Sequence, residues 1–129
     1  MKYEFAEDIQ KEASEISRIL FPHVKMENVK CFMSSGTSSR GTIARCHTIG
    51  KLMQKAIGVK PHYALEFLSE RFSRLSDEDK TRVIIHELMH IPKAFGGGFK
   101  HHDHVTTKNV NLMFKEYKKR KDGDKNRFW

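Results

Sequence analysis

The chain has 129 residues, a formal net charge of +8 and a hydrophobic residue fraction of 38%. This length suits one domain with a buried core, and no stretch reaches the ~18 to 20 apolar residues that cross a bilayer. The first residues, MKYEFAEDIQ, lack the apolar segment of a signal peptide. We therefore expect a soluble, cytoplasmic protein.

Residues Tyr3 to Leu20 have the pattern of an amphipathic helix. Apolar side chains recur every three or four residues, and charged side chains occupy the other faces. Pro22 is expected to end the helix, because proline lacks a backbone donor. The apolar positions are Phe5, Ile9, Ala13, Ile16 and Leu20.

Two short strands joined by a polar turn are expected next. Residues 29–33 read VKCFM, in which Val, Cys and Met alternate with Lys and Phe, and this is the period of a strand. Ser34 to Gly41 is rich in Ser, Gly and Thr and predicts a turn, followed by a strand from Thr42 to His47. The turn lacks the GK[ST] ending of a phosphate-binding loop.

A short helix and a third strand follow. The apolar residues from Ile49 to Ile57 favour a helix that ends at Gly58, a residue that readily adopts the left-handed conformation. In the strand, Tyr63, Leu65 and Phe67 would share one face.

The stretch from Val83 to Ile91 reads VIIHELMHI and contains an HExxH motif. On a helix, His86 and His90 lie on one face and can bind a single cation. Glu87 follows the first histidine, and its carboxylate could reach a water on the open side of the metal. This is the general-base arrangement of a zinc peptidase.

The helix that carries this motif has clear boundaries in the sequence. Ser76 and Asp79 form a capping-box-like start. Pro92 marks the end, since the residue before proline is pushed out of the α region. We expect the helix to run from Asp77 to His90.

A catalytic zinc site needs a third protein ligand. The metzincin pattern places a histidine six residues after the second, but this position is Gly96. The glycines that follow permit a reversal of the chain towards the helix end. The candidate third ligands are His102, His104, His101 and, in a gluzincin-style arrangement, Glu116. The histidines without ligand spacing are His23, His47 and His62.

A last amphipathic helix is expected from Thr107 to Lys121. No repeat or linker is visible, so residues 1–121 are expected to form one domain and residues 122–129 a mobile tail. Cys31 and Cys46 have no CxxC partner and are expected to be small buried residues. A disulfide between them would require neighbouring strands.

The combination of HELMHIP, a short glycine loop and FKHHDH resembles the zincin-type metallopeptidases of archaea and phages, which are related in plan to SprT-like proteases. The resemblance extends from the CFMSSG and ARCH strands through GVKPHYALEFLSE to the HIP motif. It implies an α+β fold with a single small zincin-like domain. In this domain, a short antiparallel or mixed sheet of about three strands would pack with the HExxH helix and the N- and C-terminal helices.

The same resemblance implies a zinc metallopeptidase that acts on a peptide or protein substrate. The family's G-x-x-[RK]-x-H arrangement matches residues 97–102 and favours His102 as the third Zn²⁺ ligand, beside His86 and His90. The strand of Tyr63 resembles the edge strand that zincin peptidases pair with an extended peptide.

The excess positive charge lies mostly in the last third of the chain. A basic helix and tail can bind nucleic acid weakly, although a solvated helix face explains the same residues. The alternative function is a nucleic-acid-associated zinc-binding module, either inactive or acting on DNA-bound proteins. No membrane partner is expected, and the oligomeric state is open. The basic residues are Lys115, Lys118, Lys119, Arg120, Lys121, Lys125 and Arg127.

Overall fold

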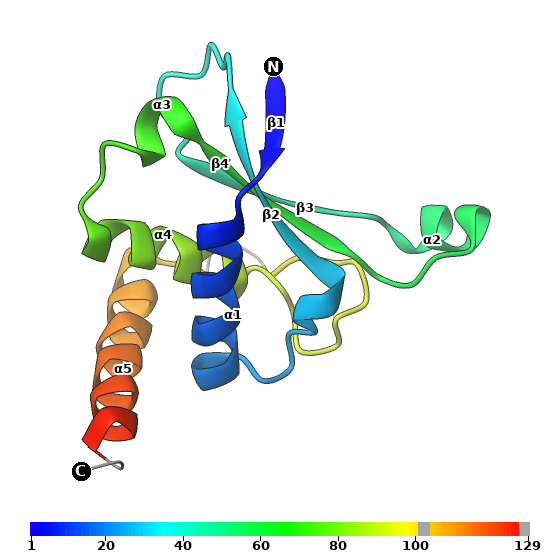
Figure 1. The fold of residues 1–129 in the computed structure, drawn as a ribbon. Helices are drawn as coiled ribbons and strands as arrows, with labels where there is room; N and C mark the ends of the chain where they lie inside the picture. Colours follow the sequence, from blue (N-terminus) through cyan, green and yellow to red (C-terminus); the bar gives the residue numbers. More distant parts are fainter. Residues whose placement is uncertain (101–103, 127–129) are drawn as a thin grey trace.

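The structure is a computed structural model that describes residues 1–100 and 104–126, with side chains described as far as residue 123. Helices α1, α4 and α5 lie on one side of a sheet (Figure 1). The elements in chain order are β1 (Lys2–Phe5), α1 (Glu7–Leu20), the 3-10 turn η1 (Met26–Asn28), β2 (Val29–Ser35), β3 (Ala44–Thr48), α2 (Lys51–Ile57), β4 (Tyr63–Leu68), α3 (Ser69–Phe72), α4 (Asp77–Met89) and α5 (Thr107–Asn126).

The sheet is mixed and has the strand order β1-β2-β4-β3. β1 is antiparallel to β2, β2 is parallel to β4, and β3 is antiparallel to β4. The predicted α+β class is confirmed. The described sheet has four strands where about three were expected, and the added strand is β1.

The prediction that the first helix begins at Tyr3 is wrong. Residues Lys2–Phe5 form β1, and α1 begins at Glu7. β1 pairs with β2, the Ala6 amide donates to the Cys31 carbonyl at 2.9 Å, and the ring of Phe5 meets that of Phe32 edge-on at 6.1 Å. A distant strand therefore supplies the partners that a helical first turn would have left unsatisfied.

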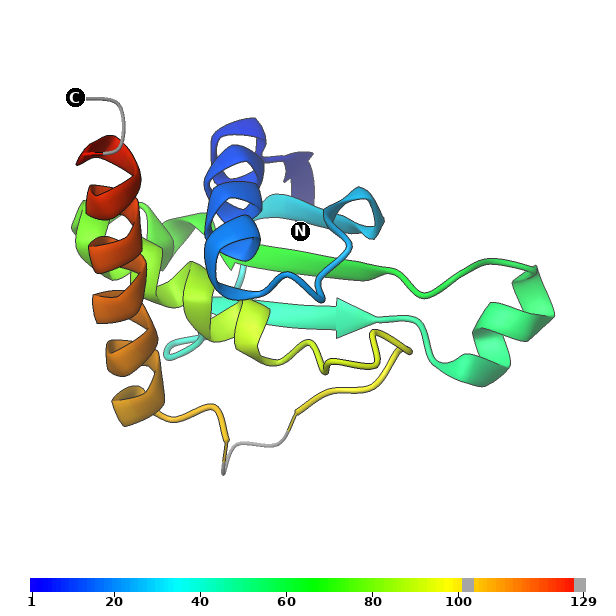
Figure 2. The same ribbon diagram turned by 90° about the horizontal axis from the view of Figure 1, so that it is seen from below.

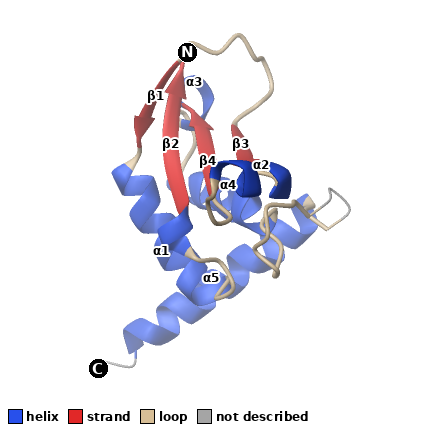
Figure 3. Cartoon of the chain, turned by 90° about the vertical axis from the view of Figure 1, so that its right-hand side faces the viewer, coloured by secondary structure: helices blue, strands red, loops and turns tan. Residues whose placement is uncertain are grey.

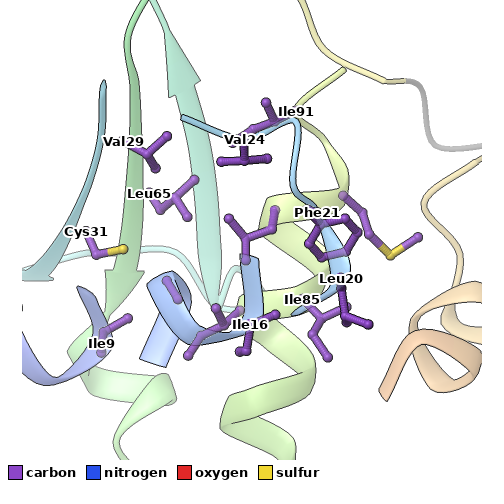
Figure 4. Packing of buried hydrophobic residues seen from close by; sticks show 14 of the residues in the cluster. Ile9, Ile16, Leu20, Phe21, Val24, Val29, Cys31, Leu65, Ile85 and Ile91 are labelled. Carbon is purple, nitrogen blue, oxygen red and sulfur yellow. The ribbon is translucent and has the colours of Figure 1, made fainter. Parts of the chain in front are cut away.

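The core lies between the sheet and the three helices (Figure 4). Val29, Cys31 and Leu65 from the sheet face Ile16 of α1 and Ile85 of α4, and all five are fully buried. Tyr63 and Phe67 share the face of Leu65, as the alternation predicted. Burial of aliphatic side chains on this scale stabilises the fold by about 1.5–3 kcal/mol for each one.

The HExxH helix has the boundaries that its sequence predicts, to within one residue. The Ser76 hydroxyl accepts a hydrogen bond from the Asp79 amide at 3.2 Å, and α4 ends at Met89, with His90 as its C-cap. Arg82 stacks over the ring of Phe114 at 4.2 Å and so joins α4 to α5.

The expectation that the Tyr63 strand is the edge strand is wrong. β4 lies between β2 and β3, and β3 is the edge strand beside α4. Cys31 and Cys46 each pair with Leu65 from opposite sides, so their strands are two spacings apart, about 9–10 Å. A disulfide requires a Cα separation below about 7 Å, and both cysteines are thiols.

The sequence also predicted where α2 and α5 end. α2 ends at Gly58, whose φ of 79° confirms the predicted left-handed cap. α5 continues to Asn126, past the end expected at Lys121, and Gly123 inside it costs only about 1 kcal/mol. Residues 127–129 lie outside the described residues. In the described chain, no helix has the length and apolar character to cross a membrane.

Candidate metal centre

Two histidines lie one above the other at the C-terminal end of α4. The ring centroids of His86 and His90 are 5.1 Å apart, and the side chain of His86 is 39% exposed, whereas His90 is buried. The i, i+4 spacing therefore places both imidazoles on one face of the helix, as predicted. This face carries two of the nitrogen ligands that zinc prefers.

His90 is held by the loop that follows the helix. Lys100 donates its amide to the His90 carbonyl at 2.8 Å, and Nδ1 of His90 lies 3.1 Å from the Lys100 carbonyl. Because a carbonyl only accepts, Nδ1 must carry the hydrogen, and Nε2 then holds the lone pair. A hydrogen bond of this kind orients a metal-ligating histidine and fixes its tautomer.

A glycine turn gives this loop its path back to the helix end (Figure 2). Gly97 has a φ of 99°, which favours glycine over any other residue. The Tyr63 hydroxyl accepts from the Gly97 amide at 3.1 Å and donates to the Gly98 carbonyl at 2.8 Å. The side-chain amide of Gln54 donates through Nε2 to the Gly96 carbonyl at 3.1 Å.

Sequence reasoning missed the part that Tyr63 and Gln54 play in this turn. Both contacts span more than thirty residues. A buried Tyr needs a partner for its hydroxyl, and this was the only signal in the sequence.

Glu87 points a buried carboxylate into the same region. It is 5% exposed, and its Oε2 lies 3.8 Å from Nε2 of His86. Burial raises the pKa of Glu87 to about 7. The carboxyl group can therefore both accept and release a proton near neutral pH.

A cleft of about 390 Å³ opens beside these three residues. Its other walls come from the edge strand β3 and from the loop that holds His90. A second cavity of about 390 Å³ continues past His86 and Glu87 towards α5. The cleft is lined by Ala44, Arg45, Cys46, His86, Glu87, His90, Phe99 and Lys100.

A family model described as "Putative phage metallopeptidase" matches residues 1–121. The chain belongs to this family. Neither a curated protein nor a solved structure matches it. The family description supports a metallopeptidase and therefore a metal cofactor. The resemblance that the HExxH and glycine-loop motifs indicated is confirmed.

The third metal ligand predicted from the sequence is not identified among the described residues. Within residues 1–100 and 104–123, no three His, Cys, Asp or Glu side chains are grouped to hold a metal ion. Of the four candidate third ligands, His104 and Glu116 lie within the described residues, and Glu116 accepts a hydrogen bond from Arg120 at 2.7 Å. The other two candidates, His102 and His101, lie outside the described residues.

Cys46 faces the cleft but has the chemistry of a buried thiol. Burial and the nearby charge of Glu87 raise its pKa to about 12. In the metal-free protein Cys46 is therefore a protonated thiol, and it lines the wall of the cleft as a small side chain.

The remaining histidines make ordinary hydrogen bonds, as expected from their spacing. His23 lies 3.1 Å from the Ile91 carbonyl, His47 lies 2.8 Å from Oε1 of Glu66, and His62 lies 2.6 Å from the Lys60 carbonyl.

Proposed function

We propose that this chain is a zinc-dependent metallopeptidase in which Glu87 is the general base. The observation that carries the proposal is the position of Glu87. Its buried carboxyl group lies beside the two imidazoles of α4, at a cleft that runs along an edge strand.

Three histidines would hold the metal. His86 and His90 present their rings on one face of α4, and because Nδ1 of His90 donates to the Lys100 carbonyl, His90 would bind the metal through Nε2. His102 is the third ligand that the family motif favours. When bound there, zinc would acidify a water molecule and polarise the carbonyl of the scissile peptide bond.

Glu87 would take the proton from the attacking water and pass it to the leaving amine. This role needs a carboxyl group that can both accept and release a proton, and in the metal-free protein burial raises the pKa of Glu87 to about 7. Few water molecules compete for the proton, since the carboxyl group is buried.

The edge strand β3 would hold the substrate. In the described sheet β3 pairs on one side only, with β4, so its other edge can pair with an extended peptide. Ala44 and Cys46 line the cleft, and their small side chains leave room for such a peptide beside His86.

Metal analysis is the first test. Purified protein incubated with zinc and then desalted should hold one zinc ion per chain, and no zinc retained would overturn the proposal. Replacing His86 or His102 by Ala should abolish zinc retention. The matched replacement His104→Ala should retain the metal, because the family motif favours His102 over His104.

Hydrolysis is the second test. Glu87→Gln should retain zinc and lose cleavage of an unfolded protein such as casein, by about 10² to 10⁴-fold for the loss of a general base. Glu116→Gln is the control and should cleave as the wild type does. Full activity of Glu87→Gln with zinc bound would contradict the role of Glu87.

A nucleic-acid-associated module is the second candidate, and the basic face of α5 favours it. Lys115, Lys118 and Lys119 are exposed on this helix. DNA binding that weakens steeply with salt, and that survives in Glu87→Gln, would support a function of this class.

A further inference from the structure

The connection between β3 and β4 projects from the domain as an arm, defined here as residues 49–60. Figures 1 and 2 show its helix α2 away from α1 and α5, and in Figure 3 this side of the molecule faces the viewer. None of the residues of α2 is buried. Leu52 is 80% exposed, Met53 51%, Ile57 58% and Val59 39%. Large aliphatic side chains gathered on one projecting element mark an interaction surface.

A groove of about 520 Å³ lies between the arm and the sheet face that points away from the helices. Ile49, Ile57 and Val59 of the arm form one wall, and Phe32 and Ala64 of the sheet form the other. We call this cavity the arm groove. Among the described residues, its lining shares no member with the cleft beside Glu87, and it is therefore a separate site.

The surroundings of the arm groove are positively charged. No Asp or Glu occurs in the sequence between Glu27 and Glu66. Lys30 lies in the lining, and the arm adds three exposed lysines at its ends and middle. These are Lys51, Lys55 and Lys60.

Glu66 does not offset this charge. Its side chain is 4% exposed, lies 3.8 Å from Arg45 and is hydrogen-bonded to His47 at 2.8 Å. The groove therefore offers aliphatic walls with a rim that attracts anions.

The aliphatic walls and the positively charged rim of the arm groove favour some binding partners over others. A second copy of the chain would bring Lys30 and the arm lysines of two molecules together, which repels. Single-stranded nucleic acid stacks its bases on exposed aromatic rings. Phe32 and Tyr63 line the groove, but Tyr63 is buried and Phe32 is half-buried with its ring edge-on to Phe5, whereas the exposed apolar side chains of the arm are aliphatic. A bilayer would engage the convex tip at Leu52, not the concave wall at Ile57.

We propose that the arm groove binds a peptide segment of another protein in which apolar side chains alternate with carboxylates. The apolar side chains fill the space between Ile57, Val59 and Phe32. The carboxylates pair with Lys30 and the lysines of the arm. This binding does not depend on the metal centre.

Fluorescence anisotropy with three sets of labelled synthetic peptides of equal length tests the proposal. The first set combines Leu and Phe with Asp and Glu, the second replaces the acids by Lys, and the third replaces Leu and Phe by Ser. The first set should bind at least about tenfold more tightly than either of the others, a difference of roughly 1.4 kcal/mol. Equal binding of all three sets, or no binding of the first, overturns the proposal.

Paired variants locate the binding. Ile57→Ser combined with Val59→Ser, and separately Lys30→Glu, should each weaken binding of the first set by about tenfold or more, whereas Glu87→Gln should not change it. Leu52→Ser is the control on the arm, because Leu52 is exposed but does not line the groove, and Lys119→Glu is the charge control on α5.

Because the substituted side chains of the arm are exposed, the arm variants should fold as the wild type does. Circular dichroism and thermal unfolding would verify that each variant is folded. An equal loss in Leu52→Ser would overturn the groove assignment. Binding to phosphatidylglycerol vesicles without binding to the peptides would overturn it in favour of a membrane surface. A concentration-dependent dimer that dissociates in the Ile57 and Val59 double variant would overturn it in favour of self-association.

Discussion

His90 and Lys100 form two hydrogen bonds with each other, one through both backbones and one through the His90 ring. The loop between them is therefore closed at its base before any metal binds. The position of the His90 ring depends on this closure. It therefore also depends on the residues that shape the loop.

Gly97→Ala should loosen the loop and weaken zinc binding. Gly97 has a φ of 99°, and an added Cβ would lie 2.6 Å from the Ile49 carbonyl and would also overlap the Gln54 amide. We expect a loss of about 1–3 kcal/mol in the free energy of unfolding. Urea unfolding and zinc titration would measure the two effects.

Gly98→Ala is the matched control for this variant. Among the described atoms, nothing lies within 4 Å of a Cβ built at Gly98, and its φ is outside the left-handed region. Its stability should stay within about 0.5 kcal/mol of the wild type. Equal losses in both variants would show that the loop tolerates no side chain anywhere.

Tyr63→Phe should destabilise the protein without changing its core packing. The hydroxyl makes two hydrogen bonds, one with the amide of Gly97 and one with the carbonyl of Gly98. Their loss leaves polar backbone groups without partners and should cost about 1–3 kcal/mol in the free energy of unfolding.

The control for this variant is Tyr3→Phe, since Tyr3 is 60% exposed on the outer strand β1. The Tyr3→Phe protein should unfold at the same urea concentration as the wild type. A stable Tyr63→Phe protein would mean that water replaces the hydroxyl at the glycine turn.

The stability of zinc-free protein should fall as pH rises. Glu87 has a folded-state pKa of about 7, above the value of 4.5 expected for the unfolded chain. Its contribution is therefore fully present below pH 4.5 and is lost as pH rises through 7. The loss amounts to about 3 kcal/mol, at roughly 1.36 kcal/mol per pKa unit.

Urea unfolding of chelator-treated wild type and Glu87→Gln across this pH range would measure the effect. The stability of the variant should decline less between pH 4.5 and 8, because its amide does not ionise. Parallel curves for the two proteins would contradict the raised pKa of Glu87.

Both cysteines should react slowly with iodoacetamide in the folded protein. Burial raises the pKa of Cys31 to about 12, and the pKa of Cys46 is equally high. The thiolate that reacts is therefore scarce at pH 8. Mass spectrometry should find two alkylated thiols after unfolding in urea, and a mass two hydrogens lower before reduction would contradict the strand order.

Local signals in the sequence predicted the parts of the site that depend on neighbours along the chain. The Ser76 cap, the end of α4 before Pro92 and the left-handed Gly58 are each decided within a few residues. The same holds for the edge-on contact of the His86 and His90 rings, which follows from the pitch of a helix.

Long-range pairing explains what the sequence did not predict. Tyr3 and Phe5 fit a helical period as well as a strand, and only contact with β2 decides between the two. The position of β4 inside the sheet was equally hidden, because a burial pattern does not reveal which strands are neighbours. The link from Tyr63 to Gly98 depends on this position.

The insertion of β4 between β2 and β3 also orders the assembly of the protein during synthesis. β3 leaves the ribosome before β4, yet among the described strands β4 is its only partner. Until residues 63–68 have emerged, β3 has no neighbour to pair with, and closing such non-local pairs is a slow step in folding. The strand that forms one wall of the cleft is thus incorporated late, and a chain truncated before β4 would expose it to aggregation.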